Sequence, residues 1–111
     1  IDFLETDIDN LVANGQVVFV DITADWCATC QFNKINVLQS TTIKEAFKKN
    51  NIVLVRADWT RPSKEIDIFL KKYNRFGIPL NAFFSSKYPE GILLSEILSE
   101  KQILNSIEKM K

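Results

Sequence analysis

Two apolar runs without regular alternation of polar and apolar residues constrain the fold of this chain more than any other feature. The run VVFVDI, from Val17 to Ile22, is rich in β-branched and aromatic residues, and NIVLVRAD, from Asn51 to Asp58, repeats the pattern. Near-continuous apolar strands are typical of sheets that are covered on both faces by helices. We therefore expect both runs to be buried strands of a helix-covered sheet.

Helical patterns separate these runs, and each has a candidate start. These starts are Thr6, Cys27, a capping box from Thr42 to Glu45, Pro62 in a first turn, and Ser99. The segments LNAFF and ILLS, on either side of a turn around Pro89 and Gly91, predict two further strands. This order of elements predicts an α/β fold with a central mixed β-sheet flanked by helices.

Length and composition fit a single domain over residues 1–111. The chain is 46% hydrophobic and 25% charged, and its 14 basic and 14 acidic side chains cancel, so nothing in its charge indicates nucleic acid or a membrane surface as a partner. No apolar run approaches the roughly 20 residues that span a bilayer, so we expect no membrane insertion of this domain. Because the sequence begins at Ile1 and not at Met, we expect that it was cut from a longer membrane protein or a fusion.

The only two cysteines, Cys27 and Cys30, form a CxxC motif within the segment VDITADWCATC. A zinc site needs four ligands, and two cysteines without any histidine do not supply them, so we expect no metal. A disulfide across two residues closes too small a loop to stabilise the fold much. Thiol–disulfide exchange is therefore the favoured use of the pair, and it requires no cofactor.

The position of the pair supports the redox interpretation. If Cys27 lies at a helix N-terminus, unpaired N–H groups and the helix dipole lower its pKa and make it the attacking sulfur. Cys30, one turn later, points inward and can resolve a mixed disulfide. We accordingly expect Cys27 to be the exposed thiol and Cys30 the buried one.

These motifs also carry a resemblance to a known family. VDITADWCATC resembles the active-site strand and helix of thioredoxin, and FGIP, from Phe76 to Pro79, resembles the thioredoxin loop with its cis-proline. More narrowly, ADWCATC, VRADWT, GIPL and LSEILS resemble the C-terminal domain of the DsbD family of transmembrane thiol:disulfide interchange proteins. The resemblance implies a thioredoxin fold, with Cys27 as nucleophile, Cys30 as resolving thiol, Asp21 as buried acid and Pro79 in the cis form.

The same resemblance implies a location and partners. Domains of this family are periplasmic parts of an inner-membrane protein, and they relay electrons from a membrane-embedded domain to a periplasmic acceptor domain. The substrates are protein thiols and disulfides. The alternatives are a free-standing thioredoxin-like reductase or oxidase of secreted proteins, and a thioredoxin-fold binding module without redox turnover, against which the intact CxxC motif argues.

The chain departs from the family pattern near the cysteines. Ala28 and Thr29 stand where common thioredoxins have Gly-Pro, and Gln31 and Lys34 replace the Lys and Glu found in many DsbD-type domains. Leu80 follows the proline where thioredoxins usually have Thr. A more apolar substrate-facing loop is expected from this last change.

Asp21 and Arg56 have two interpretations each. Asp21 ends an apolar strand, where it either faces solvent or is a buried acid that accepts a proton from Cys30, and the second role is favoured. Arg56 is either a partner of that acid or a solvated cation.

Three residues are predicted to meet the substrate. Trp26 is expected to cover the sulfur and shape a docking surface, and Ile78 and Pro79 are expected to present the loop backbone to an incoming peptide. The other aromatic residues considered, Trp59 and Phe76, are expected to be packing residues.

Overall fold

The computed structural model describes residues 1–111 and contains one four-stranded sheet in the order β2-β1-β3-β4. The strands are β1 (Val17–Thr23), β2 (Ile52–Asp58), β3 (Leu80–Phe84) and β4 (Ile92–Leu93). Strand β1 is parallel to β2 and antiparallel to β3, and β3 is antiparallel to β4. The predicted mixed sheet is confirmed, with β4 shorter than the segment ILLS.

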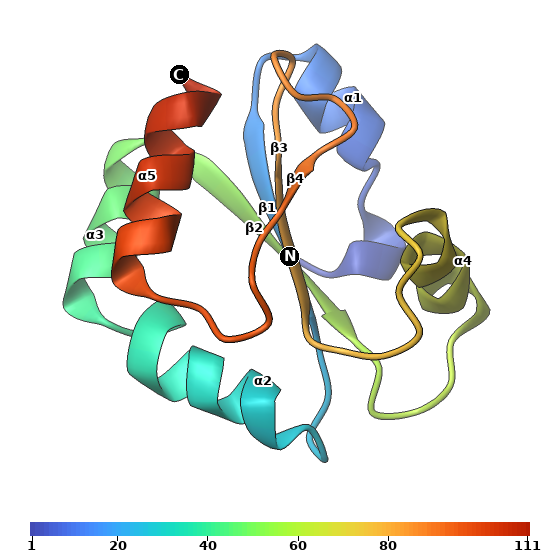
Figure 1. The fold of residues 1–111 in the computed structure, drawn as a ribbon. Coiled ribbons are helices and arrows are strands. Elements are labelled where there is room, and N and C mark those ends of the chain that lie inside the picture. Colours follow the sequence, from blue (N-terminus) through green and yellow to red (C-terminus); the bar gives the residue numbers. More distant parts are fainter.

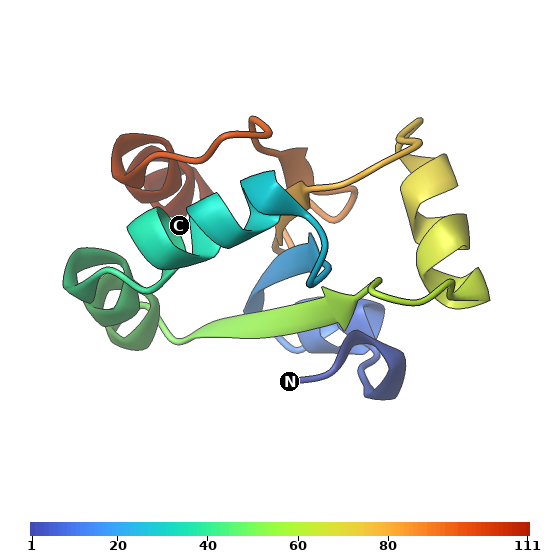
Figure 2. The same cartoon turned by 90° about the horizontal axis from the view of Figure 1, so that it is seen from below.

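Helices cover both faces of this sheet (Figures 1 and 2). One face carries α1 (Ile8–Ala13) and α4 (Lys64–Lys72), and the other carries α2 (Ala28–Asn33), α3 (Thr41–Lys49) and α5 (Glu100–Met110). A short 3₁₀ helix, η1 (Phe3–Glu5), precedes α1, and a π-helical segment, η2 (Lys34–Leu38), continues α2. No helix is long and apolar enough to cross a membrane.

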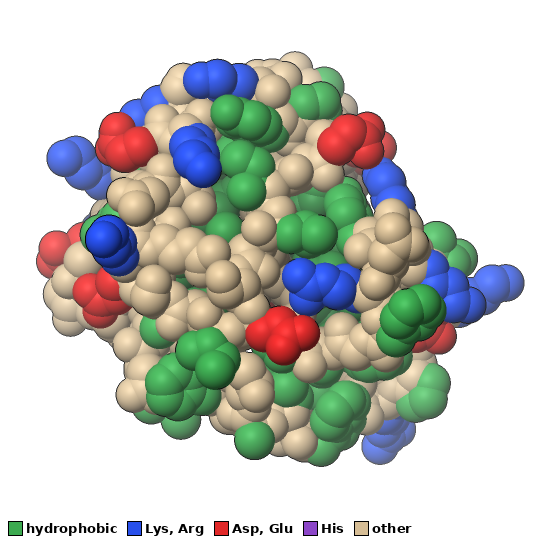
Figure 3. All heavy atoms as spheres, in the orientation of Figure 1, with side chains coloured by type: hydrophobic (Ala, Val, Ile, Leu, Met, Phe, Trp, Pro, Cys, Tyr) green, Lys and Arg blue, Asp and Glu red, His purple; other side chains and the backbone are tan.

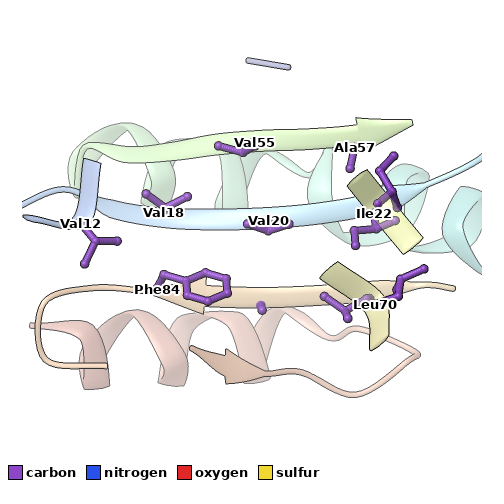
Figure 4. Packing of buried hydrophobic residues seen from close by; sticks show 11 residues of the cluster. Val12, Val18, Val20, Ile22, Val55, Ala57, Leu70 and Phe84 are labelled. Carbon is purple, nitrogen blue, oxygen red and sulfur yellow. The ribbon is translucent and has the colours of Figure 1, made fainter. Parts of the chain in front are cut away.

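Strand β1 is buried on both faces, as its near-continuous apolar sequence predicted. Val18, Val20 and Ile22 point into one core layer, where they meet side chains of β2, β3, α1 and α4 (Figure 4). Phe19 points the opposite way and packs on Phe83 with ring centroids 4.8 Å apart, in the second layer beneath α3 and α5. This central position explains why β1 tolerates few polar residues, and Asp21 is the exception.

Three helices begin at a residue other than the one that the sequence suggested. Asp7 caps α1 in place of Thr6, Ser40 caps α3 in place of Thr42, and Ser63 caps α4. In each case a side-chain oxygen accepts a hydrogen bond from the backbone N–H three residues later, at 3.0 Å for Asp7, 3.2 Å for Ser40 and 3.4 Å for Ser63. Pro62 therefore precedes the helix and does not lie in its first turn. Ser99 caps α5 as predicted.

Candidate redox site

The two cysteines lie where β1 gives way to α2. Strand β1 ends at Thr23, and Cys27 is the N-cap of α2, with its Sγ accepting a hydrogen bond from the backbone N–H of Cys30 at 3.2 Å. The two residues form a disulfide with their Cα atoms 5.2 Å apart. The prediction of a helix that starts at Cys27 is confirmed, and the cap places the first sulfur against the positive end of that helix.

Both cysteines are shielded in the disulfide form. Cys27 is 7% exposed and Cys30 is 4% exposed, and both pack with Ala24 and with Ile78 of the loop before β3. In this disulfide form neither cysteine is exposed, whereas the predicted exposure of Cys27 concerns its free thiol and stays a prediction for the reduced form. The reason for the shielding is tertiary, because Ile78 comes from a distant segment and lies against the pair.

Helix α2 is held in place by a polar contact on its buried face. The Asn33 side chain accepts a hydrogen bond from the Leu98 backbone N–H at 2.9 Å and donates one to the Glu96 carbonyl at 2.8 Å. Asn33 is itself buried, so both bonds are shielded from water. The helix that carries Cys30 is thereby tied to the loop that leads into α5.

The loop after β2 holds the segment that precedes Cys27. Thr60 Oγ1 accepts a hydrogen bond from the Asp25 backbone N–H at 2.9 Å, and the Thr60 carbonyl accepts one from Trp26 Nε1 at 3.1 Å. Thr60 in turn donates from its hydroxyl and from its backbone N–H to Asp58 Oδ1, and these bonds lower the pKa of the Asp58 carboxyl. Sequence reasoning missed Thr60, although it lies inside the quoted motif VRADWT.

Aromatic side chains are exposed on this side of the molecule. Trp26 is 61% exposed and lies against Trp59, with ring centroids 6.1 Å apart. Phe76 is 89% exposed, so its expected packing role is wrong, whereas Trp59 is half-buried against the core. Figure 3 shows hydrophobic side chains at the surface along its lower edge, where α2 and its neighbouring loops lie.

The Ile78-Pro79 peptide bond is cis, as the resemblance implied. Pro79 directly precedes β3, and Ile78 packs against the cluster that contains both cysteines. The structure therefore brings the loop FGIP and the CxxC motif together from opposite halves of the chain.

Asp21 is buried, so its alternative interpretation as a solvent-facing residue is wrong. It is 5% exposed, lies 3.6 Å from Arg56 Nε through Oδ2, and accepts a hydrogen bond through Oδ1 from Asn81 Nδ2 at 2.8 Å. Burial raises the pKa of Asp21, while Arg56, Asn81 and the positive charge of Lys34 act in the opposite direction. Arg56 is thus a partner of the acid, through the register that pairs it with Asp21.

Sequence reasoning missed Asn81. The available signal was a single amide residue within the apolar run LNAFF, where a buried polar side chain needs a partner.

No group of three or more His, Cys, Asp or Glu side chains is arranged to hold a metal ion. A surface hollow lined by Lys44, Phe47 and Ile52 among others contains neither cysteine, although Arg56, the partner of Asp21, also lines it. The groups with redox or acid–base chemistry described here are the Cys27–Cys30 disulfide and the buried carboxyl of Asp21, on the strand that leads into the CxxC motif.

Comparison with known proteins agrees with this geometry. The model of a family described as thioredoxin-like matches residues 1–86. The chain belongs to the thioredoxin-like family. A buried CxxC disulfide at the N-terminus of α2 in this fold is the arrangement of a thiol–disulfide oxidoreductase, as the sequence predicted.

Curated relatives and solved structures show which thioredoxin-like proteins this chain is similar to. This thioredoxin-like chain is 34% identical over 76 residues to the thiol:disulfide interchange protein DsbD of Yersinia pestis (strain Pestoides F), covering 68% of the chain and 12% of that protein. It is 26% identical over 109 residues to DsbD of Haemophilus influenzae (strain PittGG), covering 94% of the chain and 18% of that protein. The chain thus spans less than a fifth of the length of these curated relatives.

Among solved structures, the oxidised C-terminal domain of DsbD from Neisseria meningitidis has a similar fold. The TM-score is 0.74 at 20% identity, and the match covers 94% of this chain and 90% of that one. A thioredoxin from Thermus thermophilus gives a TM-score of 0.67 at 19% identity, covering 89% and 76%. The predicted thioredoxin fold and the predicted resemblance to DsbD C-terminal domains are confirmed.

Proposed function

We propose that this chain is the reducing module of a DsbD-type electron relay, one domain of a longer inner-membrane protein, which works in the periplasm. The observation that carries the proposal is the CxxC disulfide at the α2 N-terminus, in a chain whose curated relatives are DsbD proteins. The electrons come from a membrane-embedded domain of the same protein. They pass to disulfides of periplasmic acceptor domains.

The reaction with an acceptor disulfide has two exchanges. The Cys27 thiolate attacks one acceptor sulfur, which forms a mixed disulfide and releases the other acceptor sulfur as a thiolate. The Cys30 thiolate then attacks Cys27 Sγ, the bond from Cys27 to the acceptor breaks, and the second acceptor sulfur leaves. Two electrons have moved to the acceptor, and the Cys27–Cys30 disulfide is left to be reduced by the membrane domain.

The other site residues take supporting roles in this proposal. Asp21 accepts the proton of Cys30 before the second exchange, since it is a buried carboxylate on the strand that leads into the motif. Trp26 supplies exposed apolar surface to the acceptor, and Ile78 and Pro79 present the loop backbone next to the sulfurs.

The direction of electron flow separates a reductase from an oxidase. The segment from Ala24 to Cys30 has no Lys or His to stabilise a thiolate, and the acids Asp25 within it and Asp21 before it oppose one. A thiolate that is not overstabilised favours the disulfide, so we expect a reducing potential, nearer to about −270 mV than to the roughly −120 mV of a strong oxidant.

Equilibration of the domain with glutathione buffers measures this potential. In parallel, a Cys30→Ala variant traps the protein that Cys27 attacks as a stable mixed disulfide. We expect capture of acceptor domains in their disulfide form. A strongly oxidising potential, or capture of reduced secreted proteins only, contradicts the reductase and favours an oxidase, and absence of any exchange favours a binding module.

A further inference from the structure

Asn81 has a buried side-chain amide that takes no part in the reaction described above. It lies in β3, where every residue is buried, and it is only 2% exposed. The antiparallel register of β1 and β3 places it directly opposite Asp21. An amide at this point is costly unless it is paired, so its contact with the acid requires an explanation.

The three residues Arg56, Asp21 and Asn81 form a row across the sheet. Arg56 is paired with Asp21 between β2 and β1, and Asp21 with Asn81 between β1 and β3. Paired residues share a face of a sheet, as do residues two positions apart along a strand. The row therefore continues the face of Phe19 and Phe83, whose core layer includes Val37 of the helical segment after Cys30.

The two carboxylate oxygens of Asp21 contact different residues of this row. Oδ1 accepts from Asn81 Nδ2 at 2.8 Å, and Oδ2 lies 3.6 Å from Arg56 Nε. The charged groups that face Asp21 are Arg56 from β2 and Lys34 from the helix that follows Cys30. Because both of these partners are cations, they favour only the ionised acid.

Asn81 differs from the two cations in its hydrogen-bonding capacity. Its Oδ1 is buried and has no hydrogen-bond partner, although buried polar atoms nearly always have one. An amide carries both donors and an acceptor, and a half-turn about its last side-chain bond exchanges them. In the present orientation Nδ2 donates to the carboxylate, and in the turned orientation Oδ1 accepts the O–H of the protonated acid.

We propose that Asn81 is a positioning residue that keeps Asp21 hydrogen-bonded, and correctly placed for Cys30, in both of its protonation states. This inference rests on the proposed function, in which Asp21 takes the Cys30 proton. That proton moves from Cys30 Sγ to Asp21, and the resulting thiolate attacks Cys27 Sγ. The acceptor sulfur leaves with the electron pair of the broken bond and is protonated by solvent, and Asp21 later releases its proton to solvent.

The test compares the reduced wild-type domain with Asn81→Leu, which keeps the branched shape of the side chain and removes the hydrogen bond. Oxidised glutathione serves as the disulfide, and the rate of the second exchange is measured from pH 5 to 9 by acid quench and mass spectrometry. We expect the rate at pH 7 to fall about tenfold, a modest part of what general base catalysis contributes. Without the Asn81 donor the ionised form of Asp21 is less stable, so the pKa of Asp21 should rise. The rate of the second exchange should then begin to rise at a higher pH than in the wild type.

Two further variants separate positioning from a structural role. In an Asp21→Asn background, Asn81→Leu should change neither the rate nor the profile, because its effect passes through the acid. Asn81→Thr, which keeps a donor and an acceptor on a residue that suits a strand, should restore most of the wild-type profile. It also serves as the test if Asn81→Leu does not fold.

Asn33→Leu is the matched control, since it removes another buried amide that does not contact Asp21. It should lower stability and leave the pH profile in place. An unchanged profile in Asn81→Leu, or an equal loss of rate in the Asp21→Asn background, overturns the role of Asn81 alone. If Asp21→Asn itself leaves the second exchange unchanged, the proposed role of the acid fails together with that of Asn81.

Discussion

At the scale of single residues, the site is defined by what surrounds the buried acid. Asp21 is nearly inaccessible to water, and the cost of burying its charge outweighs the help from Arg56, Asn81 and Lys34, so its pKa is raised. The raised pKa makes Asp21 a better proton acceptor at neutral pH than a solvent-exposed carboxylate would be.

This burial has a consequence for stability that can be measured. A raised pKa means that the folded protein binds the Asp21 proton more tightly than the unfolded chain does, so this contribution to stability is complete below the unfolded pKa and is lost as the pH rises through the folded one. Asp21→Asn cannot ionise and should therefore unfold at a higher denaturant concentration than the wild type at pH 7 to 8.

Urea unfolding of the oxidised proteins across the pH range checks this prediction. The advantage of Asp21→Asn should shrink on acidification and disappear below about pH 4, where the acid is protonated in both states of the wild type. A variant that is no more stable than the wild type at pH 8 would show that the contacts with Arg56 and Asn81 outweigh burial.

At the scale of elements, the burial of individual residues shows how α2 is oriented against the core. Its buried positions, with those of η2, are Cys30, Asn33 and Val37, whereas Phe32 and Ile35 are exposed. Phe32, Ile35 and Leu38 lie at helical spacing in the sequence, but this spacing does not identify the buried face of the helix. Burial follows the contacts of Asn33 with the loop before α5 and of Val37 with the core.

The cap of α3 gives a test at this scale. Ser40 Oγ accepts the Ile43 backbone N–H, whereas Thr42 lies one residue inside the helix and is exposed. Ser40→Ala should lower the free energy of unfolding by about 1 kcal/mol, the usual value of an N-cap. Thr42→Ala, the matched control, should change it by less than about 0.5 kcal/mol.

Thermal or urea unfolding of the two variants measures the difference. The opposite ranking, with Thr42→Ala the more damaging variant, would restore the capping box that the sequence suggested and contradict the observed helix start.

At the scale of the whole molecule, redox state and folding are coupled. Reduction and unfolding form a thermodynamic cycle, so a disulfide that is difficult to reduce in the folded protein must stabilise the fold relative to the dithiol form. A strong oxidant, by contrast, is more stable when its cysteines are reduced. The proposed reductase should therefore be more stable oxidised than reduced, by about 1–2 kcal/mol for so small a loop.

Urea unfolding of the domain with and without a reductant tests this independently of the glutathione measurement. Cys27→Ser with Cys30→Ser is the control, and its stability should not depend on the reductant. A reduced form more stable than the oxidised one contradicts the reductase and agrees with an oxidase.

The sequence by itself determined the α/β order of elements, the buried character of β1 and the CxxC pair at a helix start, because all three depend on local pattern: apolar runs, caps and spacing along the chain. It did not determine which distant side chains surround that pair. Ile78 covers the cysteines, Thr60 holds the Trp26 segment, and Asn81 meets Asp21 only through the strand register. Register and packing are decided when the whole sheet assembles, because each strand pairs with partners far away in the sequence, and only the tertiary structure specifies those partners.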